Sequence, residues 1–281
     1  MGRYRVGAQA LSDKQQSEPV KATLTFLGSG TSMGVPTLGC TCAICTSSDP
    51  RNRRTRPSVL VEFGGNSVLI DTGPDFHAQA LREKITRLDA VLYTHSHADH
   101  ILGMDDLRPL SFRNPENLPL YADDATAKVI ERVFEYTFRT ENRYPTSARV
   151  KLHRLDTVPG AGVRLFGVCF RRIAVTHGRQ EITGYRFGSA AYLTDMSDIP
   201  KESMERLQGL DVLILDTLRR EPHPSHSHLA KSVGFVEKLK PKRAYFTHIG
   251  HDLDHEATEA ELPPHIRLAY DGLKLDFEIQ A

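Results

Sequence analysis

Short apolar runs that end at a turn or at a polar residue recur along the chain from residue 21 onward. Runs rich in β-branched and aromatic residues predict strands at 22–27, 58–63, 67–71, 90–93, 118–121, 162–174, 183–187, 190–194, 212–216 and 243–248. A Gly64-Gly65-Asn66 turn joins two of these runs into a hairpin. Apolar positions at helical spacing predict helices at 75–84, 126–138, 200–207 and 227–239.

The order of these elements sets the fold class. Strands and helices are mixed without a regular βαβ alternation, which favours an α/β fold with four αββα layers: two mixed sheets face to face and helices outside them. Each half of the chain would then supply one sheet. Residues 1–20 are polar and aperiodic and are predicted to form a flexible N-terminal tail, whereas 21–281 form one domain.

Composition narrows the possible partners. Apolar residues make up 40% and charged residues 25% of the chain, and 36 basic side chains balance 35 acidic ones. No field of the whole molecule would therefore attract nucleic acid or an anionic membrane, although a small phosphorylated substrate remains possible. No apolar run approaches the roughly 18 residues of a membrane span, and the N-terminus has no apolar signal segment. These features predict a cytoplasmic protein.

The segment Thr94-His95-Ser96-His97-Ala98-Asp99-His100 carries the densest group of candidate ligands and directly follows an apolar run. Buried together without a partner, these side chains would cost desolvation energy, and a divalent cation removes that cost by coordinating them. Three further ligand-type residues each follow an apolar run: His177, Asp195 and His248. Ligands from several strand ends and a shared carboxylate are what a pair of neighbouring metal ions requires.

These motifs resemble those of the metallo-β-lactamase superfamily, and they are most similar to its branch of phosphodiesterases that act on cyclic phosphates in the carbon-phosphorus lyase pathway. The resemblance covers the chain from about residue 21 and implies two divalent ions, zinc or manganese. It implies that the first ion binds His95, His97 and His177. It implies that the second binds Asp99, His100 and His248, with Asp195 bridging the two. Asp71 matches an Asp that lies behind the ligands.

A cysteine cluster is the second candidate metal site. Cys40, Cys42 and Cys45 stand too close together for good disulfide geometry, whereas three thiolates and one further ligand can close a tetrahedral zinc site. The same branch has a similar loop whose fourth ligand is a His three residues after the last active-site His, which here is His251. The alternatives are unmetallated thiols in a mobile loop, or a redox role.

The segment 221–229 contains three more imidazoles. His226 best matches the general acid proposed for the family, since an imidazole near the ions but not bound to them can protonate a leaving oxygen. With Asp99 it makes up the expected catalytic set. His223 and His228 are expected at the surface or at the entry to the next helix.

The arginine run from Arg51 to Arg56 is open to two interpretations. Charge runs are usually solvated, but Arg54 or Arg56 could instead grip a phosphate. A second recurring motif of the branch predicts an ion pair between Asp106 and Arg108 that holds the metal loop.

The predicted activity is hydrolysis of a small phosphodiester, cyclic or nucleotide-like, by a metal-activated hydroxide, in a chain that could form a homodimer. A tRNA-processing nuclease like ribonuclease Z is one alternative, but its long arm is not visible in the sequence. A second is a protein like pyrroloquinoline-quinone biosynthesis protein B, against which the complete ligand set argues. A non-enzymatic metal-binding module and a thioesterase are further alternatives. A β-lactamase is disfavoured because that branch commonly has Cys at the bridging position.

Overall fold

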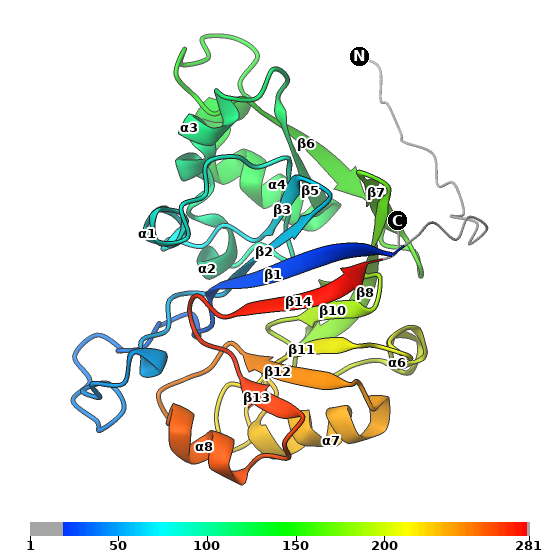
Figure 1. Cartoon of the computed structure of the whole chain (residues 1–281). Coiled ribbons are helices and arrows are strands. Elements are labelled where there is room, and N and C mark those ends of the chain that lie inside the picture. Colours follow the sequence, from blue (N-terminus) through cyan, green and yellow to red (C-terminus); the bar gives the residue numbers. More distant parts are fainter. Residues whose placement is uncertain (1–18, 280–281) are drawn as a thin grey trace.

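The computed structural model describes residues 19–279, and two β-sheets form its centre (Figure 1). The first sheet contains β1 (Val20–Gly28), β2 (Ser58–Phe63), β3 (Asn66–Ile70), β4 (Ala90–Leu92), β5 (Leu118–Asp123), β6 (Val150–Leu155) and β14 (Lys274–Ile279). Its seven strands run in the order β14-β1-β2-β3-β4-β5-β6, so that the last strand of the chain pairs with the first.

The second sheet also has seven strands. They are β7 (Gly162–Leu165), β8 (Val168–His177), β9 (Gln180–Phe187), β10 (Ala190–Leu193), β11 (Val212–Asp216), β12 (Arg243–Thr247) and β13 (Ile266–Leu268). Their order is β13-β12-β11-β10-β9-β8-β7, and β10 to β13 are parallel to one another. In β11 every residue is buried, as expected for a parallel strand that is covered on both faces.

Helices cover the outer face of each sheet (Figure 1). Beside the first sheet lie α1 (Phe76–Arg82), α2 (Ala98–Ile101), the 3₁₀ turn η2 (Met104–Leu107), α3 (Arg108–Ser111), α4 (Asp124–Val133) and α5 (Glu135–Phe138). Beside the second lie α6 (Lys201–Arg206), α7 (Leu229–Leu239) and α8 (His255–Glu261). A further 3₁₀ turn, η1 (Pro50–Asn52), belongs to the long β1–β2 connection that projects on the left of Figure 1.

Side-chain alternation along the strands creates three apolar layers. In β2, Val59, Val61 and Phe63 pack between the two sheets, whereas Leu60 faces the helices of the first sheet. A third layer lies between the second sheet and its helices and includes Phe235 and Val236 of α7. The predicted α/β fold with four αββα layers is therefore confirmed.

Several predicted boundaries were wrong. The predicted strand 162–174 is a hairpin, because Phe166 and Gly167 both have positive φ and reverse the chain. The predicted helix 126–138 begins earlier and is interrupted at Phe134, whose ψ of 36° departs from helical geometry. Strands β6, β13 and β14 and helix α8 were not predicted.

The predicted tail, residues 1–20, lies outside the described residues except for 19 and 20, and β1 begins at Val20. Among residues 19–279, no helix combines the length and the apolar character needed to cross a bilayer.

Candidate active site

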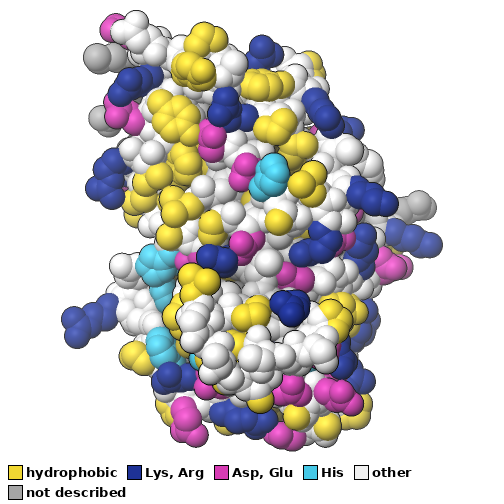
Figure 2. Space-filling model, turned by 90° about the vertical axis from the view of Figure 1, so that its left-hand side faces the viewer, with side chains coloured by type: hydrophobic (Ala, Val, Ile, Leu, Met, Phe, Trp, Pro, Cys, Tyr) yellow, Lys and Arg dark blue, Asp and Glu magenta, His cyan; other side chains and the backbone are white. Residues whose placement is uncertain are grey.

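The candidate ligands come from chain segments that follow strands of both sheets. His95 and His97 lie between β4 and α2, and His97 is the N-cap residue of α2. His177 ends β8, while Asp195 and His248 each come just after a strand of the second sheet. Histidine side chains reach the surface on the side of the molecule where α2 lies (Figure 2). The fold therefore gathers side chains that are more than 150 residues apart in the sequence.

Two groups of ligand atoms share one carboxylate. The first group is His95, His97, His177 and Asp195, and the second is Asp99, His100, Asp195 and His248. Within each group the ligand atoms all lie within 4.8 Å of one another. Asp195 Oδ1 lies 3.2 Å from His100 Nε2, and its Oδ2 lies 3.2 Å from His248 Nε2 and 3.8 Å from His95 Nε2.

Buried polar atoms without hydrogen bonds show that the residues fit a pair of metal ions. His95 Nε2, His100 Nε2, His248 Nε2 and Asp99 Oδ2 are all buried and have no hydrogen-bond partner. Each such atom costs about 1–3 kcal/mol in a protein interior. Imidazole nitrogens and carboxylate oxygens are suitable ligands for zinc and manganese, and coordination would remove this cost.

Burial and neighbouring charges set the protonation states. Burial lowers the pKa of His95 well below its usual value, which favours the neutral, ligating form. Burial would also lower the pKa of His248, but Asp195 beside it raises that pKa to about 10. In the same way, burial is outweighed at His100, whose pKa is raised well above normal by Asp195 and then Asp99. Protons on His100 and His248 thus balance the carboxylates, and a divalent ion would displace them.

Hydrogen bonds behind the ligands orient the imidazole rings. His100 Nδ1 lies 2.7 Å from Asp71 Oδ2, and Thr94 Oγ1 donates to the same oxygen at 2.7 Å. His177 Nδ1 donates to the carbonyl of Ser225 at 2.8 Å. Both contacts engage Nδ1 and leave Nε2 for a metal ion. Asp71 thus stands behind His100, the kind of position that the family resemblance implies.

Backbone strain coincides with this cluster. Asp71, Asp195 and His248 all have positive φ, at 65°, 55° and 58°. A non-glycine residue in this left-handed region is uncommon and costs on the order of 1 kcal/mol or more. Three such residues, one after a strand of the first sheet and two after strands of the second, indicate that the placement of their side chains determines the local backbone conformation.

His226 lies beside both groups and is held by a residue that sequence reasoning missed. Its Nδ1 lies 2.7 Å from Asp216 Oδ2, and its ring centroid lies 4.8 Å from that of His177 and 4.6 Å from that of His248. Asp216 is fully buried at the end of β11. Burial and then the charge of His248 lower the pKa of His226 to about 4, although the nearby Asp195 and Asp99 act in the opposite direction.

The other two histidines of this segment differ from each other. His228 is the N-cap residue of α7, which agrees with the predicted helix entry. His223, expected at the surface or at the helix entry, is partly exposed, and its ring lies 5.1 Å from that of His226.

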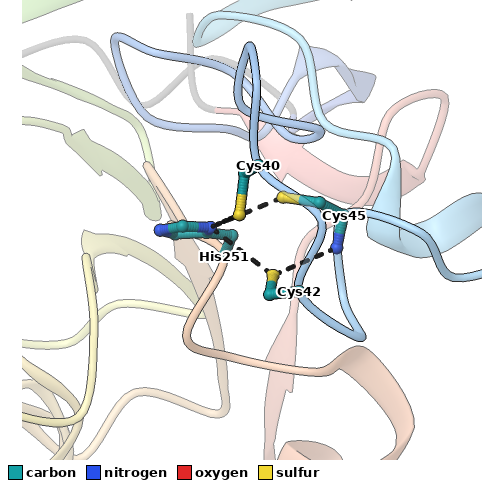
Figure 3. Close-up of side chains that lie close together, drawn as sticks. All are labelled: Cys40, Cys42, Cys45 and His251. Carbon is teal, nitrogen blue, oxygen red and sulfur yellow. Dashed lines mark hydrogen bonds between the residues drawn. The ribbon is translucent and has the colours of Figure 1, made fainter.

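The cysteine cluster forms a compact site of its own (Figure 3). The sulfur atoms of Cys40, Cys42 and Cys45 lie 3.3, 3.6 and 3.4 Å from His251 Nδ1. Tetrahedral zinc, with bonds of about 2.3 Å to sulfur and 2.0–2.1 Å to nitrogen, places such atoms roughly 3.6 Å apart. The backbone N–H of Cys45 donates a hydrogen bond to the sulfur of Cys42. This hydrogen bond is the main reason that the pKa of Cys42 is lowered to about 6, which favours its thiolate. These four residues therefore fit a closed zinc site.

Comparison with known proteins identifies the family. The model of a protein family described as "Beta-lactamase superfamily domain" matches residues 66–249, which is more than half of the chain. The chain belongs to the β-lactamase superfamily. This confirms the predicted family.

Relatives within the superfamily refine the picture. A crystal structure described as a new diphosphatase from the PhnP family is 56% identical, has a TM-score of 0.88, and covers 94% of this chain and 100% of that chain. A protein of Porphyromonas gingivalis named octanoyltransferase is 38% identical over 89% of this chain and 50% of its own length. A ribonuclease Z of Bradyrhizobium sp. is 28% identical over 52% of this chain and 48% of its own. The chain thus spans about half the length of these two curated relatives.

The arginine run has a different role from either of those predicted for Arg54. Arg54 is 1% exposed, and its guanidinium donates to the carbonyls of Gly250 and Leu253 at 2.9 and 2.8 Å. It is neither solvated nor open to a phosphate, and burial lowers its pKa to about 10. Instead it holds the turn that carries both His248 and His251. Arg56 pairs with Asp75 at 3.1 Å.

The ion pair predicted between Asp106 and Arg108 was wrong. Arg108 Nη1 pairs with Asp105 Oδ2 at 3.2 Å, and Nε donates to the carbonyl of Thr146. Asp106 lies 3.4 Å from Nδ1 of His77 on α1. Asp105 and Arg108 are three residues apart, one turn, which brings their side chains together, whereas Asp106 points toward a different neighbour.

Proposed function

We propose that this chain is a binuclear metal-dependent phosphodiesterase that hydrolyses small phosphodiesters, cyclic or nucleotide-like. The observation that carries the proposal is the position of Asp195, one buried carboxylate common to both ligand groups. The similarity to a diphosphatase of the PhnP family over nearly the whole chain supports it. Zinc and manganese both suit the ligands, so the identity of the ions is part of the test.

Each residue of the site has a separate role in the proposed reaction. His95, His97 and His177 would hold one ion, Asp99, His100 and His248 the other, and Asp195 would join them. Two such ions would lower the pKa of a water molecule toward neutral pH and neutralise charge on the phosphoryl oxygens. His226 would then donate a proton from Nε2 to the departing oxygen, while Asp216 holds its Nδ1 and stabilises the imidazolium.

The main alternative within the superfamily is processing of tRNA. The similarity to the ribonuclease Z of Bradyrhizobium sp. covers about half of the chain, at 28% identity, and the net charge of +1 gives no general attraction for RNA. The name octanoyltransferase belongs to a protein of which this chain spans only half, and therefore does not carry over. Among the remaining alternatives, a complete pair of ligand groups favours hydrolysis over an oxidative or purely binding role.

Turnover of a substrate panel by one metal-analysed sample tests the proposal. The panel contains bis-(p-nitrophenyl) phosphate, a cyclic ribose phosphate, a cyclic nucleotide and a precursor tRNA. We expect chelator-sensitive hydrolysis of small diesters and no cleavage of the tRNA. Cleavage of tRNA without hydrolysis of any small diester would replace this function with the nuclease.

We further propose that Cys40, Cys42, Cys45 and His251 hold one structural zinc ion. Four ligands leave no open position for chemistry, so this ion would fasten the β1–β2 connection to the turn after β12. A homodimer and a cytoplasmic location remain predictions.

A further inference from the structure

His223 occupies a position that the proposed reaction does not use. Its ring packs on the side of His226, at a centroid distance of 5.1 Å and an interplanar angle of 45°. His226 in turn contacts the rings of His177 and His248. His223 is thus the outermost member of a row of imidazoles that leads away from the metal ligands and past the proposed general acid.

The hydrogen bonds of Ser225 define the tautomer of His223. The backbone N–H of Ser225 donates to His223 Nδ1 at 3.3 Å, so Nδ1 is an acceptor and carries no proton. The ring proton must then be on Nε2, which makes that atom a hydrogen-bond donor. Burial and then the neighbouring His226 lower the pKa of His223, which agrees with a neutral ring. Among residues 19–279 no hydrogen bond engages Nε2, and the His223 side chain is partly exposed.

The segment that carries His223 is held firmly. The carbonyl of Ser225 accepts the Nδ1 proton of the metal-ligand candidate His177, while its N–H serves His223. Arg219 donates to the carbonyls of Glu221 and Pro222 at 3.1 and 2.7 Å, directly before His223. One residue therefore couples His223 to the metal cluster, and a second fixes the turn in front of it.

The surroundings of His223 are suited to an anion. Arg219 makes no ion pair with any carboxylate within residues 19–279, and its charge is near enough to lower the pKa of His223. The β8–β9 turn approaches as well, because a Cβ at Gly178 would lie 3.2 Å from Ser225 Cβ. The next residue, Arg179, is exposed and likewise forms no ion pair in that described range. Close to His223 there is thus one guanidinium that no carboxylate neutralises, and a second arginine stands on the adjacent turn.

We propose that His223 binds the leaving group of the substrate through its Nε2–H, and that this leaving group is itself a phosphate ester, so that diesters of diphosphate are preferred substrates. The inference rests on the proposed function, because it is the general acid His226 that places the departing oxygen on this side. In the reaction, water adds to one phosphorus and the bond from that phosphorus to the bridging oxygen breaks. The two products are phosphate monoesters, and the second one leaves past His223.

Two substrates separate binding of the leaving group from general effects on the site. Symmetric diphenyl diphosphate releases phenyl phosphate, whereas bis-(p-nitrophenyl) phosphate releases p-nitrophenolate, which has no phosphate. The His223→Phe variant keeps a ring against His226 but has no donor. A hydrogen bond to a charged group predicts a roughly 10- to 100-fold loss of kcat/KM for diphenyl diphosphate. For bis-(p-nitrophenyl) phosphate we expect a change of less than about threefold.

Two further variants control the measurement. His223→Gln restores an N–H donor and should recover part of the loss on diphenyl diphosphate. His265→Phe changes an exposed histidine just before β13, at the sheet edge opposite the metal cluster, and should alter neither substrate. Metal content and Tm, measured on every variant, should match the wild type.

The possible failures are distinguishable. Equal losses on both substrates, or no loss on either, would overturn the role of His223. A wild-type enzyme that hydrolyses bis-(p-nitrophenyl) phosphate but not diphenyl diphosphate would overturn the preferred substrate and leave the proposed function intact. A metal-loaded enzyme that hydrolyses neither would overturn the proposed function itself.

Discussion

Replacing Asp216 with Asn should disable His226 as a general acid while leaving the metal ions in place. The 2.7 Å contact between Asp216 Oδ2 and His226 Nδ1 is fully buried on the aspartate side. Without the carboxylate, burial and the charge of His248 still lower the pKa of His226, so its protonated form becomes harder to populate. The residue itself stays folded into β11, since its backbone is part of the strand ladder.

The size of the effect follows from that contact. A hydrogen bond between charged groups contributes about 1.5–3 kcal/mol, which corresponds to roughly 10- to 150-fold in kcat. Removing the imidazole altogether, in His226→Ala, should cost on the order of 10²- to 10⁴-fold, the usual range for general acid catalysis. Both losses should appear with a cyclic nucleotide, whose leaving group is an alkoxide, and shrink with bis-(p-nitrophenyl) phosphate, whose leaving group needs little protonation.

A double-mutant cycle with metal analysis tests whether Asp216 acts through His226. The Asp216→Asn, His226→Ala double variant should be no slower than His226→Ala alone, because Asp216 acts through His226. Ser232→Ala is a matched control, since Ser232 Oγ donates to the backbone carbonyl of Asp216 and not to its carboxylate. Additive losses, or equal losses with both leaving groups, would show that Asp216 does not act through His226. So would loss of an ion, because Asp216 also lies 3.9 Å from His248 Nδ1.

Four other perturbations have definite expected outcomes. Asp195→Ala should release at least one ion and lower kcat by at least about 10³-fold; an unchanged kcat would contradict its bridging role. Cys42→Ser should remove one zinc equivalent and lower Tm more than kcat, and full retention of zinc would exclude the closed site. Arg54→Met should lower the free energy of unfolding by about 2–4 kcal/mol in urea, because two buried carbonyls lose their donor; a loss under about 0.5 kcal/mol would show that water replaces it. The gain in Tm on adding metal to chelated protein should grow from pH 6 to pH 10, since protons on His248, whose pKa is about 10, compete with the ion below that pH; a gain that shrinks with rising pH would contradict this competition.

The parts of the site that were predictable from sequence share one signal. Asp195 and His248 each follow an apolar run. A polar residue that follows a buried strand is expected to lie at the edge of the sheet. Asp216 has the same signal at the end of β11 and was missed, because it belongs to no ligand motif and functions only through His226.

The environment of a charged side chain was not predictable from local sequence. Arg54 and Arg53 are neighbours, yet Arg54 is buried and Arg53 is exposed, because the partners of Arg54 are carbonyls almost 200 residues away. Likewise, Arg108 forms its ion pair with Asp105 rather than with Asp106 because of the pitch of a short turn.

Element boundaries failed for a related reason. The reversal at Phe166 and Gly167 needs two residues with positive φ, and an apolar Phe conceals the turn inside a long apolar run. In contrast, β14 has a clear alternation of exposed and buried residues that marks a strand and could have been found.

The most direct test of the whole account is the metal content of active, chelator-free protein, measured together with its turnover of bis-(p-nitrophenyl) phosphate. Two ions at the shared carboxylate and one at the cysteine cluster predict three equivalents per chain, with turnover that is lost when chelation removes the pair and returns with zinc or manganese. Full turnover by protein that holds a single equivalent, retained by the cysteines, would contradict it.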